Sequence, residues 1–373
     1  MGVVLRKSAG SSSVVFEPFK PYVVSQVQLQ KIMGDENLKT RVFKITDLAP
    51  RVKNFHVAAR SSSTQSLLLY AGSGGYGDQI LAWPFAHILS KMGFEIHIMV
   101  DPGNEMCWWC FPWVKSIVTV PMPWEQFKLY SYHVLFETCA NHDEHPDQLH
   151  PVDTMLEKVG IPHLSINPDQ KAVRPAFFPQ EIARVRQFKP DAKVALYQLA
   201  ASTPVRSLPA DESAFLLGCL AQEFPDWTWI GLYDEFVHET YHNAATDLKL
   251  PNVEVATFSV LRDLWILAQR AEVIVSPDSM MTHVAGTSGI PCVGLWGPTS
   301  PMHRVRYYRH HVPVFPREKC PISPCFYTGG VFPAYCPPST VGRTACEVLM
   351  GVKPQAVFDA VKTARASKIE AKT

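Results

Sequence analysis

The sequence has few charged residues and no surplus of either sign. Charged side chains make up 18% of its 373 residues, and 35 Lys and Arg oppose 34 Asp and Glu, for a formal net charge of +1. Proteins that bind nucleic acid or anionic membranes through bulk charge carry a basic surplus. The composition therefore does not indicate nucleic acid or an anionic membrane as a partner, although it leaves a local basic patch open.

Long apolar runs are also missing. The sequence contains no stretch of about 18 apolar residues, which a membrane-spanning helix needs, and its N-terminus lacks the basic-then-apolar pattern of a secretory signal. We therefore expect a cytoplasmic protein without a transmembrane segment. In that compartment the nine cysteines are expected to be reduced thiols or metal ligands rather than disulfides.

The length and the 47% hydrophobic content predict two domains, each large enough to bury a core. We expect a weakly β N-terminal extension at 1–65, a first domain at 66–180, a second at 190–345 and a C-terminal helical segment at 346–373. The proline-rich stretch 168–179 is expected to contain the linker.

The stretch AEVIVSPDSMMTHVAGTSGIP, residues 271–291, predicts a strand, a turn and a helix. The β-branched strand ends at Pro277, and Asp278 or Ser279 can cap the helix that follows. Gly289 with Pro291 ends this helix. A helix start presents free backbone N–H groups and the positive end of its dipole, which suits a phosphate.

A second strand, Cys292 to Trp296, follows directly and is apolar enough to be buried in a parallel sheet. The turn Gly297-Pro298-Thr299 then lies at its C-terminal end. Because ligands of open α/β sheets bind at that edge, the turn and the helix start are expected to border one site.

Residues 66–101 predict a strand, a glycine-rich turn, a helix and a strand, which is a Rossmann-type beginning. Gly72, Gly74 and Gly77 match G-x-G-x-x-G, and Asp101 stands where a ribose-binding acid belongs, so a dinucleotide-dependent oxidoreductase is one interpretation. Asp78, which follows the last glycine, can act as a helix N-cap or carry chemistry.

Two strings resemble glycosyltransferase family 9, the heptosyltransferase-like enzymes. PDSMMTHVAG…GIPCVGLWGPTSP is similar to the family's DSG-x-x-H-x-A…G-x-P-x-v-x-l-f-G-P-T-x-P signature, and GYGDQILAWPFAHIL to its G-D-x-l-x-a-x-P-x-x-x-x-L motif. The resemblance covers about residues 66–362. It departs from the family at Met280, where a glycine is usual, and this difference bears on how closely the backbone can approach the donor.

The resemblance implies an α/β protein of the GT-B fold, with two Rossmann-like domains facing across a cleft. It implies transfer of a sugar from a nucleotide diphosphate-sugar to an acceptor hydroxyl with inversion, and no required cofactor or metal. The acceptor is a glycan or another hydroxyl-bearing molecule. A hydroxylated DNA base or a protein side chain remains open as acceptor, as does peripheral attachment to the inner membrane.

The resemblance also implies roles for particular residues. Asp78 matches the family's proposed catalytic base, beside an acceptor-side loop of Gly74, Gly75 and Gly77. Arg206 falls where the family has a lysine that holds the donor diphosphate, and it can do so bidentately or be a surface arginine. The full donor-binding set is Arg206, Asp278, Ser279, Met280, Met281, His283, Gly297, Pro298 and Thr299.

Three features stay open. His283 can reach a phosphate or pack as a core histidine. The C-terminal cysteines Cys320, Cys325, Cys336 and Cys346 have a spacing at the loose edge of zinc sites, so core thiols are the alternative. A non-catalytic sugar-nucleotide binder would keep Arg206 and dispense with Asp78. The final helix, 354–366, is expected to pack back on the first domain, as in GT-B folds.

Overall fold

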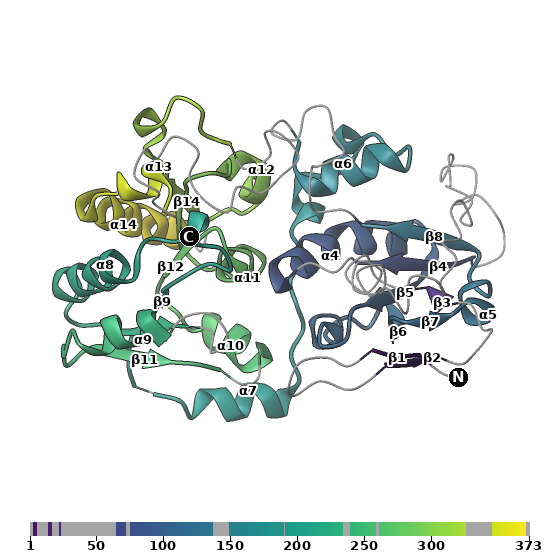
Figure 1. The fold of residues 1–373 in the computed structure, drawn as a ribbon, viewed down its shortest axis with the longest axis horizontal. Coiled ribbons are helices and arrows are strands. Elements are labelled where there is room, and N and C mark those ends of the chain that lie inside the picture. Colours follow the sequence, from purple (N-terminus) through teal and green to yellow (C-terminus); the bar gives the residue numbers. More distant parts are fainter. Residues whose placement is uncertain are drawn as a thin grey trace. The chain divides into compact units, whose positions relative to one another are not determined.

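The computed structural model describes residues 3–5, 14–16, 22–23, 65–71, 75–136, 149–189, 191–233, 239–258, 261–325 and 345–370. The chain forms two compact units (Figure 1): unit 1 comprises Met1–Thr138 and Met155–Ser165, and unit 2 comprises Cys139–Thr154 and Ile166–Thr373. A single boundary between residues 180 and 190 was expected. Instead, helix α6 (Pro151–Lys158) begins in unit 2 and ends in unit 1.

Unit 1 is built on a four-stranded parallel sheet with the order β6-β5-β4-β8. Its elements are β4 (Gln65–Tyr70), α4 (Tyr76–Lys91), β5 (Phe94–Val100), η1 (Glu105–Cys107), β6 (Val114–Thr119), β7 (Met122–Pro123), α5 (Trp124–Phe127), β8 (Tyr132–Leu135) and η2 (His163–Ser165). Leu67, Leu68 and Leu69 of β4 are all buried. Since neighbouring strand residues point to opposite faces, β4 is covered on both sides.

Helix α4 lies within residues 66–101, where the sequence predicted a helix between two strands. Gly75 is its N-cap and Met92 its C-cap. Pro84 stands inside the helix without ending it, and apolar side chains of the helix, from Ile80 to Leu89, are buried. The strand and the helix therefore form as the sequence predicted, while residues 72–74 of the glycine-rich turn lie outside the described residues.

Unit 2 is built on a six-stranded parallel sheet with the order β11-β10-β9-β12-β13-β14. Its strands are β9 (Val194–Gln198), β10 (Thr228–Leu232), β11 (Val253–Ala256), β12 (Ile274–Pro277), β13 (Cys292–Leu295) and β14 (His311–Val314). Every residue of β12 and β13 is buried. This burial explains the continuous apolar runs VALY, IV and CVGL, which are typical of parallel strands covered on both faces.

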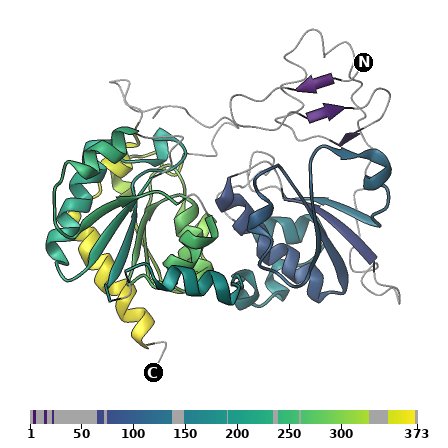
Figure 2. The same cartoon turned by 90° about the horizontal axis from the view of Figure 1, so that it is seen from below.

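Helices flank both faces of this sheet (Figure 2). They are η3 (Pro168–Lys171), α7 (Pro179–Arg186), η4 (Pro204–Arg206), α8 (Ala210–Glu223), α9 (Glu239–Thr246), α10 (Leu261–Ala268), α11 (Met280–Ser288), α12 (Pro301–Val305), η5 (Arg317–Lys319), α13 (Glu347–Met350) and α14 (Pro354–Glu370). None of the helices in the described part of the chain is long and apolar enough to cross a membrane.

The expected packing of the C-terminal helix on the first domain is wrong. Helix α14 buries Val357, Val361 and Ala364 in the core of unit 2, and its Lys362 and Arg365 pair with Glu223 and Glu272 of that unit. The helix covers one face of the unit 2 sheet, beside α8. Its small apolar stripe therefore completes the core of the second unit.

The N-terminal extension contributes three short strands, β1 (Val3–Leu5), β2 (Val14–Phe16) and β3 (Tyr22–Val23). β1 pairs antiparallel with β2, and β3 pairs antiparallel with β7 of unit 1. The remaining residues of the weakly β region expected at 1–65 lie outside the described residues.

Candidate functional site

The candidate site lies in unit 2, where β12 turns into α11. Ser279 is the N-cap residue of α11, but its side chain does not cap the helix. The Ser279 hydroxyl instead lies 2.9 Å from Ser276 Oγ. The first N–H groups of a helix have no partner within the helix, so this end of α11 keeps amides and a positive dipole end for an anionic ligand.

Asp278 forms contacts that connect the start of α11 to two neighbouring turns. Its side chain is buried, and Oδ2 accepts a hydrogen bond from Thr299 Oγ1 at 2.8 Å. Arg206 Nη1 donates to the Asp278 backbone oxygen at 3.0 Å and lies 3.7 Å from Oδ2. The structure thus brings together three of the predicted donor residues, although they are far apart in the sequence.

Electrostatics keeps Asp278 ionised. Burial by itself would raise the pKa of this carboxyl, but the positive charges of Arg206 and Arg304 and the Thr299 hydrogen bond outweigh burial and lower the pKa below its ordinary value. Asp278 is consequently a fixed anion, and its bonds to Arg206 and Thr299 hold the two neighbouring turns.

Arg206 is held in one orientation. Its Nε donates to Thr203 Oγ1 at 3.0 Å, and its Nη2 donates to Ser202 Oγ at 2.6 Å. Its side chain is 17% exposed, so the guanidinium retains an accessible edge. These contacts suit a phosphate-binding arginine at the start of α11 better than a freely moving surface side chain.

The Gly297-Pro298-Thr299 turn follows β13 and is buried. A Cβ atom at Gly297 would lie 2.7 Å from Leu349 Cγ and 3.1 Å from Cys346 Sγ. Glycine therefore lets the C-terminal segment pack against this turn. The Gly297 carbonyl also accepts a hydrogen bond from the Ser323 hydroxyl at 2.8 Å.

The first residues of α11 differ in exposure. Met281 is fully buried, whereas Met280, where the resembling family has glycine, is partly exposed. His283 is buried and its Nδ1 lies 3.1 Å from the Tyr308 hydroxyl. Burial lowers the pKa of His283 to about 3, so this imidazole is neutral at physiological pH.

In unit 1, Asp78 is the third residue of α4. The N-cap of α4 is Gly75, and no side chain caps the helix, so the alternative of Asp78 as N-cap is wrong. The Asp78 amide donates to the Gly75 carbonyl at 2.9 Å, and among the described residues none hydrogen-bonds the Asp78 carboxylate. Gly77 lies in the same first turn, and Gly74 lies outside the described residues.

Other predicted features are only partly described. Gly72 lies outside the described residues, and Asp101, the acid of the dinucleotide interpretation, accepts a hydrogen bond from Tyr70 at 3.2 Å. Cys320, Cys325 and Cys346 are buried, while Cys336 is not described. Within the described ranges, no three His, Cys, Asp or Glu side chains are arranged to hold a metal.

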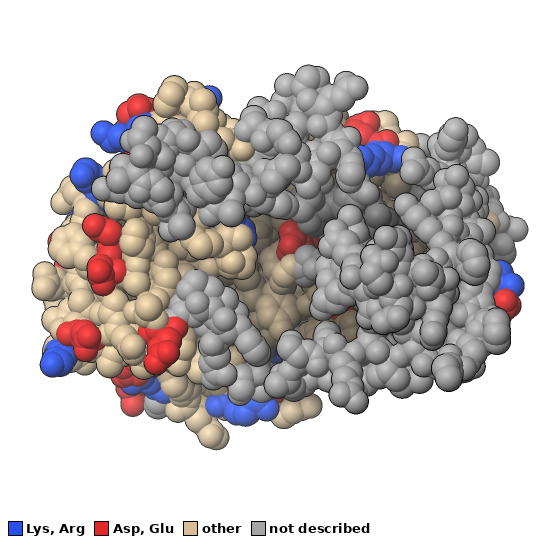
Figure 3. Space-filling view, viewed as in Figure 1, with Lys and Arg blue, Asp and Glu red and all other residues tan. Residues whose placement is uncertain are grey.

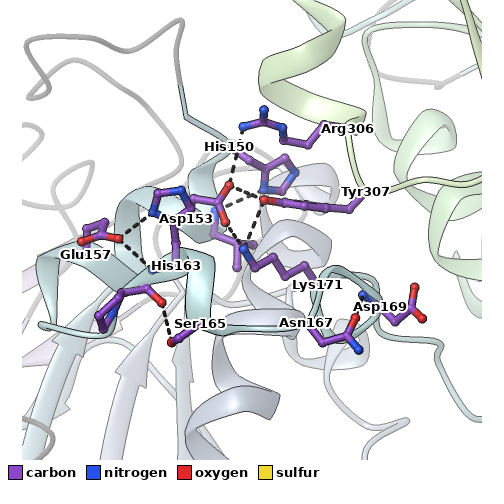
Figure 4. Close-up of polar contacts among 12 residues, drawn as sticks. His150, Asp153, Glu157, His163, Ser165, Asn167, Asp169, Lys171, Arg306 and Tyr307 are labelled. Atoms are coloured by element: carbon purple, nitrogen blue, oxygen red, sulfur yellow. Dashed lines mark hydrogen bonds and ion pairs between the residues drawn. The ribbon is translucent and has the colours of Figure 1, made fainter.

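A buried polar cluster beside α12 was not predicted from the sequence (Figure 4). Lys171 Nζ lies 2.6 Å from Asp153 Oδ1 and 3.2 Å from the Tyr307 hydroxyl, which also bonds Asp153 Oδ2. Arg306 lies 3.7 Å from the same carboxylate. Asp153 and Lys171 are almost fully buried, so the cluster fixes the first turn of α6 to the segment after α12.

Arg304 is a second residue that sequence reasoning missed. It is buried on α12, and its charge acts on Asp278 and His283. The available signal was the cationic run His303-Arg304-Val305-Arg306 directly after the Gly-Pro-Thr turn, in a chain with few charges. On the face seen in Figure 3, Lys and Arg side chains are interspersed with Asp and Glu over the described residues.

Residues 166–333 match the model of glycosyltransferase family 9 (heptosyltransferase). A search of curated proteins found no match.

Solved structures resemble most of the chain. ADP-heptose LPS heptosyltransferase II from E. coli aligns with a TM-score of 0.63 at 13% identity, over 83% of this chain and 100% of that one. A family 9 glycosyl transferase from Veillonella parvula aligns with 0.62 at 14% identity, over 85% and 99%. E. coli heptosyltransferase WaaC with ADP aligns with 0.51 at 13% identity, over 82% and 99%.

At these identities the structural likeness shows the fold, which is the predicted GT-B fold, and the family model supplies the activity class. The predicted resemblance and the predicted class of enzyme are confirmed. Residues 166–333 are similar to glycosyltransferase family 9 (heptosyltransferase), and this match supports the predicted nucleotide-sugar glycosyltransferase.

Proposed function

We propose that this enzyme binds the diphosphate of its donor between Arg206 and the N-terminus of α11, and transfers the sugar to an acceptor hydroxyl with inversion. The observation that carries the proposal is the uncapped start of α11 beside a guanidinium held by Ser202, Thr203 and Asp278. Free amides and a fixed cation are what a leaving diphosphate requires.

The sugar is proposed from the neighbours. WaaC from E. coli was solved with ADP and with ADP-2-deoxy-2-fluoro heptose. We extend an ADP-linked heptose to this chain as the first donor to test, with a glycan as acceptor. The net charge of +1 does not favour a nucleic-acid acceptor.

The proposed reaction needs a base that removes the acceptor proton, and its electrophile is the anomeric carbon of the donor sugar. The acceptor O–H gives its proton to the Asp78 carboxylate while its oxygen attacks the anomeric carbon. The bond from that carbon to the phosphate oxygen breaks on the opposite side, which inverts the configuration. The nucleoside diphosphate leaves with the bonding electrons, and Arg206 with the α11 amides stabilises its growing negative charge.

Asp78 suits the role of base because no described residue hydrogen-bonds its carboxylate and because it is partly exposed. Asp278 does not suit it, since its carboxylate is buried and engaged by Thr299. The two acids are therefore assigned different roles, with Asp78 as base and Asp278 as organiser of the donor turns.

The test is a thermal-shift panel of ADP, GDP, UDP and CDP, followed by transfer assays with the sugars of the base that stabilises the protein. We expect one nucleoside diphosphate to raise the melting temperature, and the product anomer to be opposite to the donor anomer. If no nucleotide binds, the proposed donor site fails; if the product retains the donor configuration, the role of Asp78 as base fails.

A further inference from the structure

Tyr308 can pack directly against α11 because this helix has a glycine at the point of contact. A Cβ atom at Gly286 would lie 2.1 Å from the Tyr308 ring. The bare backbone of Gly286 lets the ring lie across α11, next to Trp296 and Val305. The Tyr308 hydroxyl thereby reaches His283 Nδ1, one turn earlier on the same helix, at 3.1 Å.

The direction of this hydrogen bond fixes the tautomer of His283. A phenol is a good donor, and an unprotonated imidazole nitrogen is a good acceptor. If Nδ1 donated instead, the buried Tyr308 hydroxyl proton would have no partner among the described residues, and buried donors are rarely left unpaired. With Tyr308 donating to Nδ1, the ring proton of neutral His283 lies on Nε2.

The surroundings keep His283 neutral. The ring is 4% exposed, and burial, followed by the positive charges of Arg304 and Arg206, lowers its pKa, although Asp278 acts in the opposite direction. No described residue hydrogen-bonds Nε2. Nε2 is not one of the fully buried unpaired nitrogen atoms of the described residues, so solvent reaches it, and a bound ligand can accept a hydrogen bond from it there.

We propose that Tyr308 is a positioning residue, which holds His283 as the Nε2–H tautomer so that this N–H donates to a phosphate oxygen of the donor. This inference rests on the proposed donor site, because His283 lies in the first turn of α11, next to the amides and Arg206. Phosphate oxygens at neutral pH are chiefly acceptors. A neutral imidazole N–H therefore adds a bond there without adding a charge that must be desolvated.

The first experiment measures the tautomer without any ligand. A long-range ¹H–¹⁵N correlation spectrum resolves the ring nitrogens of the 14 histidines, and the spectrum of His283→Gln assigns His283 by loss. We expect the Nε2–H tautomer in the wild type and a mixture in Tyr308→Phe. An Nδ1–H tautomer in the wild type, or a Tyr308→Phe spectrum unchanged at His283, would overturn the role of Tyr308.

The second experiment measures binding by calorimetry, using ADP or whichever of GDP, UDP and CDP stabilises the wild type. His283→Leu should raise the Kd about 10- to 100-fold, as for one lost hydrogen bond to a charged group, and Tyr308→Phe about 3- to 10-fold. His283→Gln, which keeps an N–H, should bind better than His283→Leu. The control is Tyr197→Phe, because Tyr197 is equally buried but its hydroxyl meets Ser213.

The outcomes separate this inference from the proposed function. Unchanged Kd values for His283→Leu and Tyr308→Phe, alongside weaker binding by Arg206→Ala, would overturn the inference and leave the donor site standing. A wild type that binds none of the nucleotides would overturn both. If Tyr197→Phe and Tyr308→Phe weakened nucleotide binding equally, the loss would reflect a general packing effect, and the inference would again be overturned.

Discussion

Asp78 and Asp278 occupy similar places in the two units. Each follows a buried parallel strand and lies at the beginning of a helix, Asp78 as the third residue of α4 and Asp278 just before α11. Their surroundings differ. Asp278 is buried and held by Thr299 and Arg206, whereas Asp78 is partly exposed and no described residue hydrogen-bonds its carboxylate.

In the proposed mechanism, this difference gives the two aspartates different roles. A carboxylate that is already bonded to protein groups is stabilised as an anion, which makes it a poor proton acceptor but a good organiser. A carboxylate without such bonds keeps its oxygens for a substrate proton. Replacing each acid by its amide should therefore have effects of different kinds.

The largest effect is expected from Asp78→Asn. The amide cannot accept the acceptor's proton, so the chemical step should slow by roughly 10²–10⁴-fold. The fold should be unaffected because Gly75, and not Asp78, is the N-cap of α4. Single-turnover rates at saturating donor measure the step, and calorimetry with the nucleoside diphosphate should give a wild-type Kd.

Asp101→Asn is the matched control, because Asp101 follows the next strand, β5, and is engaged by Tyr70. It should transfer sugar at close to the wild-type rate. An Asp78→Asn rate within a few-fold of wild type would move the base elsewhere. The next candidates would then be Asp143 and Glu144, which the sequence places in the acidic, histidine-containing stretch NHDEHPDQ, residues 141–148, outside the described residues.

Asp278→Asn should change stability rather than proton transfer. The amide oxygen can still accept from Thr299, but the buried charge that balances Arg206 and Arg304 is lost. Removing one partner of a buried pair costs about 3–5 kcal/mol, and the partly exposed Arg206 places this case at the lower end. Urea unfolding measures the difference, and Asp101→Asn again serves as the control.

The same variant has a predicted pH dependence. The folded-state pKa of Asp278 is lowered, so its charge stabilises the protein above the unfolded pKa, about 3.9, and this contribution is lost as the pH falls through the folded value. The wild type and Asp278→Asn should therefore converge in stability in acid. A difference that stays constant from pH 7 to pH 3 would contradict the charge argument.

Local patterns in the sequence predicted the strand, the turn and the helix around Asp278 correctly. Pro277 ends β12, and Gly289, with a φ of +67°, ends α11 in the left-handed conformation that favours glycine. These signals act within a few residues, so spacing alone placed Asp278 at the helix start and Thr299 in the facing turn.

Contacts between distant residues could not be predicted in this way. Asp153 meets Tyr307 across 154 positions of sequence, and nothing near either residue indicates the other. The same lack of a local signal explains why the sequence did not predict which unit α14 packs against. Its stripe of Val357, Val361 and Ala364 shows that one face must be buried, but such a stripe fits the sheet of either unit.

A smaller effect is expected from Arg206→Ala. Loss of one charge-assisted contact should weaken binding of the nucleoside diphosphate by about 1.5–3 kcal/mol, because the α11 amides remain. Arg365→Ala is the matched control, since it removes an arginine of the same unit that pairs with Glu272. Unchanged calorimetric affinity in Arg206→Ala would remove Arg206 from the site.

The smallest effect is expected from a chelator. In the proposed mechanism, Arg206 and the positive end of α11 supply the charge that a divalent cation would otherwise bring to the leaving diphosphate, so turnover in excess EDTA should equal turnover without it. Activity that vanishes with EDTA and returns with Mg²⁺ or Mn²⁺ would show that the donor site needs a metal. A loss of thermal stability in EDTA that only Zn²⁺ restores would point instead to the C-terminal cysteines. The two results differ in the ion that rescues them and in whether rate or stability changes, so one titration distinguishes a metal at the diphosphate from a metal in the C-terminal segment.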